Sequence, residues 1–131
     1  MAVNLKDIKV QSQNTFSGVT ETSDDKLYFV EAVVIVKTYH SGTNWYRIYS
    51  DGWCEQGGQT NSIAHDASAT VVFEQPFIDS DYMINITGIG SYSSSNSSVP
   101  VVTTRAYNNF TIRNGSSTSQ SFMWEAKGYI S

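Results

Sequence analysis

The sequence predicts an all-β domain built as an antiparallel β-sandwich. Short runs rich in β-branched and aromatic residues alternate with turns made of Gly, Asn, Asp and Ser. No long stretch carries apolar residues at helical spacing, and the only prolines among the 131 residues are Pro76 and Pro100. These observations favour strands over helices as the elements that carry the domain.

The composition restricts the classes of partner. Hydrophobic residues make up 40% and aromatic residues 13% of the chain, whereas charged residues make up 15%, below the usual quarter. This balance predicts one folded domain rather than a disordered chain. The net charge of −4, without a basic run, argues against nucleic acid as a partner because little is present to neutralise a phosphate backbone.

Membrane insertion, export and disulfide formation are not expected either. The longest apolar run, Ala32 to Val36, is far shorter than the roughly 20 residues that cross a bilayer. Met1 to Val10 lacks the apolar core of a signal peptide. Cys54 has no second cysteine to pair with, so a chain that works outside a cell needs another source of rigidity, such as oligomerisation.

The first elements are less regular than the later ones. Residues 1–32 are interpreted as an N-terminal connector or an extra strand, and residues 33–131 as the β-sandwich domain. Val30 to Tyr39 is rich in β-branched residues, which suit a pleated strand, although a short buried helix stays open at this point. His40 to Asn44 follows as a turn.

The sharpest local signal is a hairpin. Two aromatic-rich runs, Trp45 to Tyr49 and Trp53 to Gln56, flank Ser50-Asp51-Gly52. Asp-Gly between such runs favours a type I′ turn, in which both central residues have positive φ. A two-residue turn of this kind pairs Ser50 with Trp53, Tyr49 with Cys54, Ile48 with Glu55 and Arg47 with Gln56.

The register decides which side chains share a face of the hairpin. It puts Tyr46, Ile48 and Trp53 on one face, and Trp45, Arg47, Tyr49 and Cys54 on the other. Both faces carry large apolar side chains, so both need cover. A small sandwich covers only the inner face of each sheet. We therefore expect the outer face to meet a neighbouring subunit.

The later strands follow the same alternation. Ala69 to Glu74 and Tyr82 to Ile89 flank the turn Gln75 to Asp81 and are expected to pair with each other. Tyr82, Ile84 and Ile86 share one face. Gly90 to Ser98 and Asn114 to Ser119 are polar loops, and Val101 to Tyr107 and Phe110 to Ile112 are further strands. The last strand, Phe122 to Ile130, places Phe122, Trp124, Ala126, Gly128 and Ile130 on one face.

Three segments resemble one known family. WYRIYSDGWCEQGG, from Trp45 to Gly58, closely resembles the signature of the C-terminal domain of bacteriophage and prophage tail-fibre proteins. TVVFEQPFIDSDYMINIT is similar to the family's strand, Pro-aromatic turn and strand, and SFMWEAKGYI resembles its closing segment. The likeness runs from about Val33 to Ser131.

The resemblance implies a function in host attachment. Such domains form the distal tip of homotrimeric fibres of the virion, made in the bacterial host cytoplasm, and bind receptors on the bacterial surface, often polysaccharide. The shared motif is interpreted as architectural and trimer-forming, with the residues Trp45, Tyr46, Arg47, Tyr49, Asp51, Gly52, Trp53 and Trp124. Receptor choice lies in loops that differ among members, so no binding residue is transferred from the family.

Candidate ligand-binding residues are therefore chosen by their chemistry. Sugars are bound by neutral hydrogen-bonding groups and by aromatic faces on which their C–H groups pack. The first polar loop and the turn before Phe110 carry such groups: Tyr92, Asn96, Tyr107, Asn108 and Asn109. The competing interpretation of each is an ordinary turn residue or a tyrosine at a sheet edge.

Catalysis is not expected. Cys54 with His40 or His65 contains the groups of a nucleophile and a base, but a thiol in mid-strand among aromatic residues is usually a small buried hydrophobe. The acids that glycosidase chemistry would need show no specific pairing: Asp51, Glu55, Asp66, Asp79 and Asp81.

Metal and cofactor binding are not expected either. His40, His65 and Asp66 match neither a zinc spacing nor a calcium loop. An axial metal held by one histidine from each of three subunits stays open. The predicted function is adhesion without turnover. The alternatives are a cellular lectin or carbohydrate-binding module, which would be a monomer, and a purely structural trimerisation cap, which would bind no glycan.

Overall fold

A computed structural model of the chain describes residues 32–90 and 100–131. Within these ranges every regular element is a β-strand. The strands are β1 (Ile35–Ser41), β2 (Asn44–Tyr49), β3 (Trp53–Gln59), β4 (Ser68–Val72), β5 (Met83–Ile89), β6 (Val101–Ala106), β7 (Asn109–Arg113) and β8 (Ser121–Tyr129). The described part of the chain has no helix long and apolar enough to cross a membrane. The predicted connector lies, apart from its last residue, outside the described residues.

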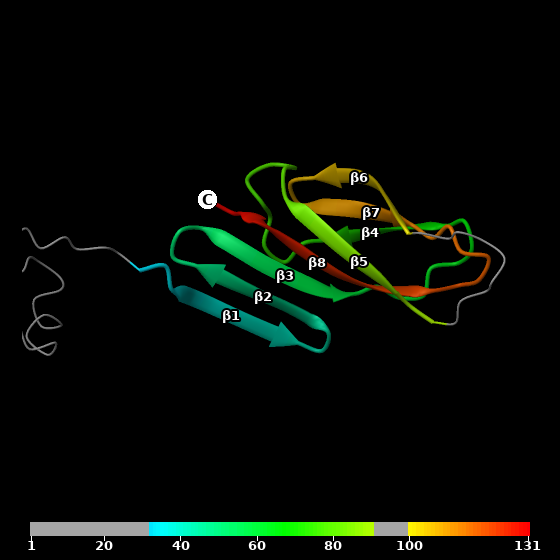
Figure 1. Cartoon of the computed structure of the whole chain (residues 1–131), viewed down its shortest axis with the longest axis horizontal. Helices are drawn as coiled ribbons and strands as arrows, with labels where there is room; N and C mark the ends of the chain where they lie inside the picture. The colour runs from blue at the N-terminus through cyan, green and yellow to red at the C-terminus, as the bar shows by residue number, and fades with distance from the viewer. Residues whose placement is uncertain (1–31, 91–99) are drawn as a thin grey trace, which may run out of the picture. The chain divides into compact units, whose positions relative to one another are not determined.

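The strands form two antiparallel sheets, which confirms the predicted fold class. The larger sheet has the order β1-β2-β3-β8-β5, and the smaller sheet has the order β4-β7-β6. Figure 1 shows the smaller sheet lying against the β3-β8-β5 side of the larger one, with β1 and β2 extending beyond it. All seven side chains of β1 are exposed for this reason.

The core lies between the two sheets and is mainly aromatic. Phe73, in the segment that follows β4, has ring centroids of four other aromatic residues within 6 Å of its own. Those rings belong to Phe77, Tyr82, Phe110 and Trp124. The predicted inward face of the last strand is confirmed, because alternate residues of β8 from Phe122 to Gly128 are buried.

The predicted hairpin exists, but its turn type and register are wrong. The amide of Gly52 donates to the carbonyl of Tyr49, and only Gly52 of the loop residues has positive φ. The loop therefore has three residues, Ser50-Asp51-Gly52, as in a type I turn followed by a glycine bulge. The Asp51 carboxylate accepts from the amide of Trp53 and stabilises this turn. The observed pairs are Tyr46 with Gln56, Arg47 with Glu55 and Ile48 with Cys54.

This shift of one residue moves every side chain of β3 to the other face. Cys54 lies on the inner face with Tyr46 and is fully buried. Trp53 lies on the outer face with Trp45 and Tyr49, instead of with Tyr46 as predicted. The outer face of the hairpin is consequently richer in aromatic residues than the sequence indicated.

The predicted pairing of Ala69–Glu74 with Tyr82–Ile89 is also wrong. β4 pairs with β7 in the smaller sheet, whereas β5 pairs with β8 in the larger one. The connecting segment crosses from one sheet to the other because Phe73 and Phe77 bury their rings between the sheets. Burial of these two rings outweighs the short-range hairpin that the sequence spacing favoured.

The adjacent glycines of the family-like segment each make room for an indole. A Cβ atom on Gly57 would lie 2.7 Å from Nε1 of Trp45, and one on Gly58 would lie 3.2 Å from Nε1 of Trp124. Since successive strand residues face opposite ways, Gly57 admits an indole on one face and Gly58 admits one on the other. The glycine pair therefore allows tight packing on both sides of β3.

Candidate functional site

The predicted ligand-binding residues lie in two places along the chain. Tyr92 and Asn96 lie outside the described residues. Tyr107 and Asn108 form the turn between β6 and β7, where the Tyr107 side chain is 56% exposed. Nδ2 of Asn109 donates to Oδ1 of Asn108, 2.8 Å away, so these two amides hold each other. Of the three described candidates, Tyr107 offers the largest free surface.

The backbone of this turn is held from beneath. The carbonyls of Tyr107 and Asn108 accept from the amides of Phe77 and Phe73, at 2.8 and 3.0 Å. The hydroxyl of Tyr82 lies 2.9 Å from the carbonyl oxygens of both Ala106 and Asn109. These bonds tie the turn to the core and give the Tyr107 ring a fixed base.

Tyr82 is itself fixed by its surroundings. Its side chain is buried, and this burial raises the pKa of its phenol above the ordinary value, against a smaller opposing effect of Arg105. The Arg105 guanidinium lies 5.9 Å from the centre of the Tyr82 ring and donates to the Tyr82 carbonyl at 3.0 Å. The phenol therefore keeps its proton as a donor to the turn at neutral pH.

Strand β6 separates Tyr107 from the point at which the described chain resumes, Pro100. The strand has six residues, which corresponds to about 20 Å. The other predicted polar loop, residues 114–119, lies near this second end, because Val101, the first residue of β6, pairs with Arg113 just before the loop. The structure thus brings Tyr107, Asn108 and Asn109 together and keeps them apart from the loop at Asn114.

The loop at Asn114 is built around a buried amide. The Asn114 side chain is 0% exposed, and its Nδ2 donates to the carbonyls of Ile63 and Thr118 at 2.8 and 2.9 Å. Its Oδ1 accepts from the amide of Ser116 at 2.9 Å. Sequence reasoning placed this asparagine in a polar loop and did not predict its burial, since its contacts with Ile63 come from a distant part of the chain.

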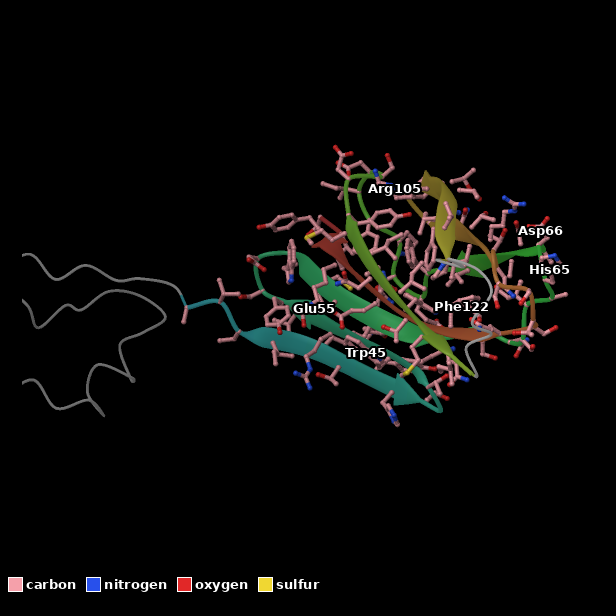
Figure 2. All side chains as sticks on the ribbon, turned by 45° about the vertical axis from the view of Figure 1, so that its right-hand side comes forward. Trp45, Glu55, His65, Asp66, Arg105 and Phe122 are labelled. Atoms are coloured by element: carbon pink, nitrogen blue, oxygen red, sulfur yellow. The ribbon has the colours of Figure 1, made fainter. Side chains whose placement is uncertain are left out.

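The family-like motif occupies both faces of the larger sheet. Tyr46 and Trp124 are buried on the inner face, whereas Trp45, Tyr49 and Trp53 are half-buried on the outer face. Arg47 is exposed on the same outer face. Figure 2 labels Trp45 and Glu55 on β2 and β3 of this sheet.

Glu55 organises the outer aromatic residues. Its carboxylate accepts from the Tyr49 hydroxyl at 3.5 Å and from Nε1 of Trp53 at 3.4 Å. Lys127 lies 3.8 Å from the same carboxylate and 2.7 Å from Glu125. The hydrogen bond and charge of Glu125 raise the pKa of the exposed Lys127 amine. Sequence reasoning considered Glu55 only as a possible catalytic acid and missed this role.

Exposed apolar side chains extend this outer face. Around the aromatic residues stand Ile35 at 47%, Met83 at 65%, Met123 at 50% and Tyr129 at 46% exposure. Tyr129 packs edge-on against Trp53, with the ring centroids 5.1 Å apart. The charged side chains of Arg47, Glu55 and Lys127 lie in one row among these residues. Exposed apolar side chains in this number are typical of a surface that contacts another molecule.

The inner side of the sandwich opens as a groove of about 480 Å³. One wall is β4, an edge strand of the smaller sheet, and the other is the part of β2 and β3 that the smaller sheet does not cover. Asn44, Ser62, Glu74 and Trp124 are among the lining residues. No sequence pattern indicated this groove, because its walls come from two sheets.

The groups considered for catalysis lie in different surroundings. Cys54 is fully buried, and this burial, followed by the charge of Glu55, raises the pKa of its thiol to about 11. His65 instead bonds through Nδ1 to the carbonyl of Ser116, and Asp66 pairs with Arg113 at 2.6 Å. Figure 2 shows His65 and Asp66 together at one end of the molecule. In the described ranges no three metal-ligating side chains form a group that could hold an ion.

Comparison with known proteins gives matches among solved structures. No protein-family model and no curated protein matches the chain. The N-truncated tail fibre of an R2-type pyocin matches with a TM-score of 0.57 and 21% identity, over 75% of this chain and 38% of that one. The C-terminal part of the R2 pyocin fibre of P. aeruginosa has the same TM-score and identity, over 75% of this chain and 26% of the fibre chain.

A third match agrees with the first two. The C-terminal part of the R1 pyocin fibre of P. aeruginosa has a TM-score of 0.53 and 17% identity, over 72% of this chain and 28% of the fibre chain. This chain therefore spans well under half of the solved fibre chains. The likeness shows a shared fold, and the proteins that share it are tail fibres, the class that the sequence resemblance indicated.

Proposed function

We propose that this domain is the distal tip of a phage or prophage tail fibre, where a homotrimer binds a polysaccharide receptor on the bacterial surface without turning it over. Two independent observations support this. The family-like segments Trp45 to Gly58 and Ser121 to Ile130 predicted such a domain, and the fold is one that solved tail fibres contain.

The main support for a trimer is the exposed apolar surface on the outer face of the larger sheet. Trp45, Tyr49 and Trp53 are half-buried there, and Met83 and Met123 are at least half exposed. Burial of apolar area is worth about 25 cal/mol per Å², so covering these side chains with another copy would favour association. Identical copies supply the same face at equal concentration, and rotational symmetry closes the assembly.

The described chemistry supports adhesion rather than turnover. The Cys54 thiol keeps its proton at neutral pH because burial raises its pKa to about 11. Tyr107 offers an exposed aromatic ring on a turn fixed to the core. Three such rings in one assembly increase the effective concentration of weak single sites, and the gain in avidity reaches roughly 10²–10⁴.

The trimer is tested by light scattering on the purified chain. The natural chain is expected at three times its monomer mass. Met123→Lys places a charge on the outer face and is expected to give a folded monomer, whereas Val101→Lys, at a position of similar exposure on β6, keeps the trimer. A monomeric natural chain, or a monomeric Val101→Lys beside a trimeric Met123→Lys, overturns the assignment.

Receptor binding is tested by adsorption to whole bacteria. The natural chain is expected to bind cells of at least one strain, and Tyr107→Ala is expected to bind less while its mass is unchanged. Failure to adsorb to any strain or glycan preparation favours the structural cap. Shortening of a polysaccharide during incubation with the chain contradicts the absence of turnover.

A further inference from the structure

The groove beside β4 has the position and size of a binding site. Its volume of about 480 Å³ lies within the roughly 300–1,000 Å³ that small-molecule sites occupy. It lies between the two sheets, so two of its walls belong to strands. β4 forms one wall, and residues 59–64 close it between β3 and the first residues of β8.

The walls of the groove are fixed before any ligand arrives. The amide of Thr60 donates to the carbonyl of Phe122 at 2.9 Å, and the amide of Phe122 donates back to the Thr60 hydroxyl at 3.0 Å. Ile63 and Gln120 exchange two backbone bonds, of 2.8 and 3.0 Å. A wall held in this way loses little conformational freedom on binding, which favours affinity.

The lining combines apolar surface with uncharged hydrogen-bonding groups. Trp124 and Ile63 supply apolar surface, and Ala69 and Val71 on β4 face the same interior. The side-chain amides and hydroxyls along the groove belong to Asn44, Thr60, Asn61 and Ser62. Alternating C–H and hydroxyl groups of a sugar ring match such a lining, because hydroxyls both donate and accept.

The charge of the residues that line the groove restricts the class of sugar that can bind there. Among the residues of 32–90 and 100–131 that line the groove, Glu74 alone is charged, and none is a lysine, arginine or histidine. Phosphate and carboxylate groups are bound in proteins by cationic side chains, so a phosphorylated or uronic sugar would enter against the field of Glu74. Neutral hydroxyls, in contrast, donate well to a carboxylate.

We infer that the groove between β4 and the β2-β3 edge binds one or two uncharged sugar residues of the receptor polysaccharide. This inference rests on the proposed function. It assigns the recognition of the sugar to the interior edge of the sandwich, whereas Tyr107 would contact the polymer at another point of the surface.

The test blocks the groove and leaves the rest of the surface intact. Ser62→Trp puts an indole at an exposed lining residue, and Ser80→Trp makes the same change at an exposed residue that does not line the groove. Each chain is measured on immobilised oligosaccharides of glucose, galactose, mannose and N-acetylglucosamine, on their phosphorylated and uronic counterparts, and on whole cells. Circular dichroism and light scattering check fold and mass.

The expected result is binding of the natural chain to at least one neutral series, a loss of at least tenfold in Ser62→Trp, and binding within twofold of natural in Ser80→Trp. Equal binding by both variants overturns the assignment of the groove as a sugar site but not the proposed receptor function. Preference for the phosphorylated or uronic series also overturns this assignment and leaves the receptor function in place. Adsorption to cells without binding to any neutral sugar does the same. Absence of binding to both glycans and cells overturns the receptor function as well.

Discussion

Asn114 gives the strongest single test of the loop architecture. Its side chain is 0% exposed and forms hydrogen bonds with two segments that are distant from each other in sequence. Asn114→Ala removes the donor to the carbonyls of Ile63 and Thr118 and the acceptor for the amide of Ser116. Ser116 is only 2% exposed, so its amide has little access to water as a substitute partner.

The expected cost follows from these lost partners. A buried polar group left without a partner costs about 1–3 kcal/mol. In Asn114→Ala the amide of Ser116 and the carbonyl of Thr118 lose their partner, whereas the carbonyl of Ile63 still accepts from the amide of Gln120. The free energy of unfolding should therefore fall by about 2–4 kcal/mol. For a domain of this size that corresponds to a decrease in Tm of roughly 8 °C or more.

Urea unfolding followed by circular dichroism, at one protein concentration, measures this change. Asn114→Asp is the matched control, since it keeps an acceptor for Ser116 but turns a carboxylate towards carbonyl oxygens. At neutral pH it should be at least as destabilised as Asn114→Ala, and it should recover part of its stability at acidic pH, where the protonated acid can donate. A loss below 1 kcal/mol in Asn114→Ala, or a fully stable Asn114→Asp at neutral pH, would refute the role of the buried amide.

Two further predictions concern β3. Gly57→Ala brings a Cβ atom to 2.7 Å from Nε1 of Trp45. This variant should lose about 1–3 kcal/mol of stability and shift the indole fluorescence. The control Gly42→Ala has no atom within 4 Å of its Cβ, so it should change stability only through its backbone strain and leave the fluorescence unchanged. An unshifted spectrum in Gly57→Ala contradicts this packing. The pKa of the Cys54 thiol rises from 9.0 to about 11 on folding, so the unfolded chain loses the thiol proton first as pH rises. The free energy of unfolding should therefore fall by roughly 2–3 kcal/mol between these two pH values. Cys54→Ala should lack this part of the fall in urea titrations from pH 8 to 11, and an equal fall in both chains would show that the thiol does not contribute.

The sequence was most informative where the structure depends on neighbouring residues. Alternation along Phe122 to Gly128 predicted the buried face of β8, and Tyr82, Ile84 and Ile86 indeed share the inner side of the larger sheet. The hairpin of Trp45 to Gln56 was also predicted, but Asp-Gly fits both a two-residue and a three-residue loop. The observed choice, with positive φ at Gly52 alone, placed Trp53 on the outer face.

The candidate site depended more on long-range packing. Tyr107 was predicted as an exposed turn residue, and it is 56% exposed. Its support by Tyr82, Phe73 and Phe77 was not predicted, because these partners lie on other strands and connections. The same holds for Glu55, whose partners Tyr49, Trp53 and Lys127 meet only when three strands are paired.

The sequence by itself determined the strand-forming segments and the antiparallel all-β class, since these depend on short-range alternation. Likeness of its motifs indicated the kind of proteins with which the fold is shared. Tertiary structure decided which strands pair, where Phe73 and Phe77 carry the chain from one sheet to the other, and where a groove opens beside β4. The physical reason is that burial of large side chains is shared between distant segments. Its free energy exceeds the preferences of any single turn, so the pairing of strands is settled by the whole core.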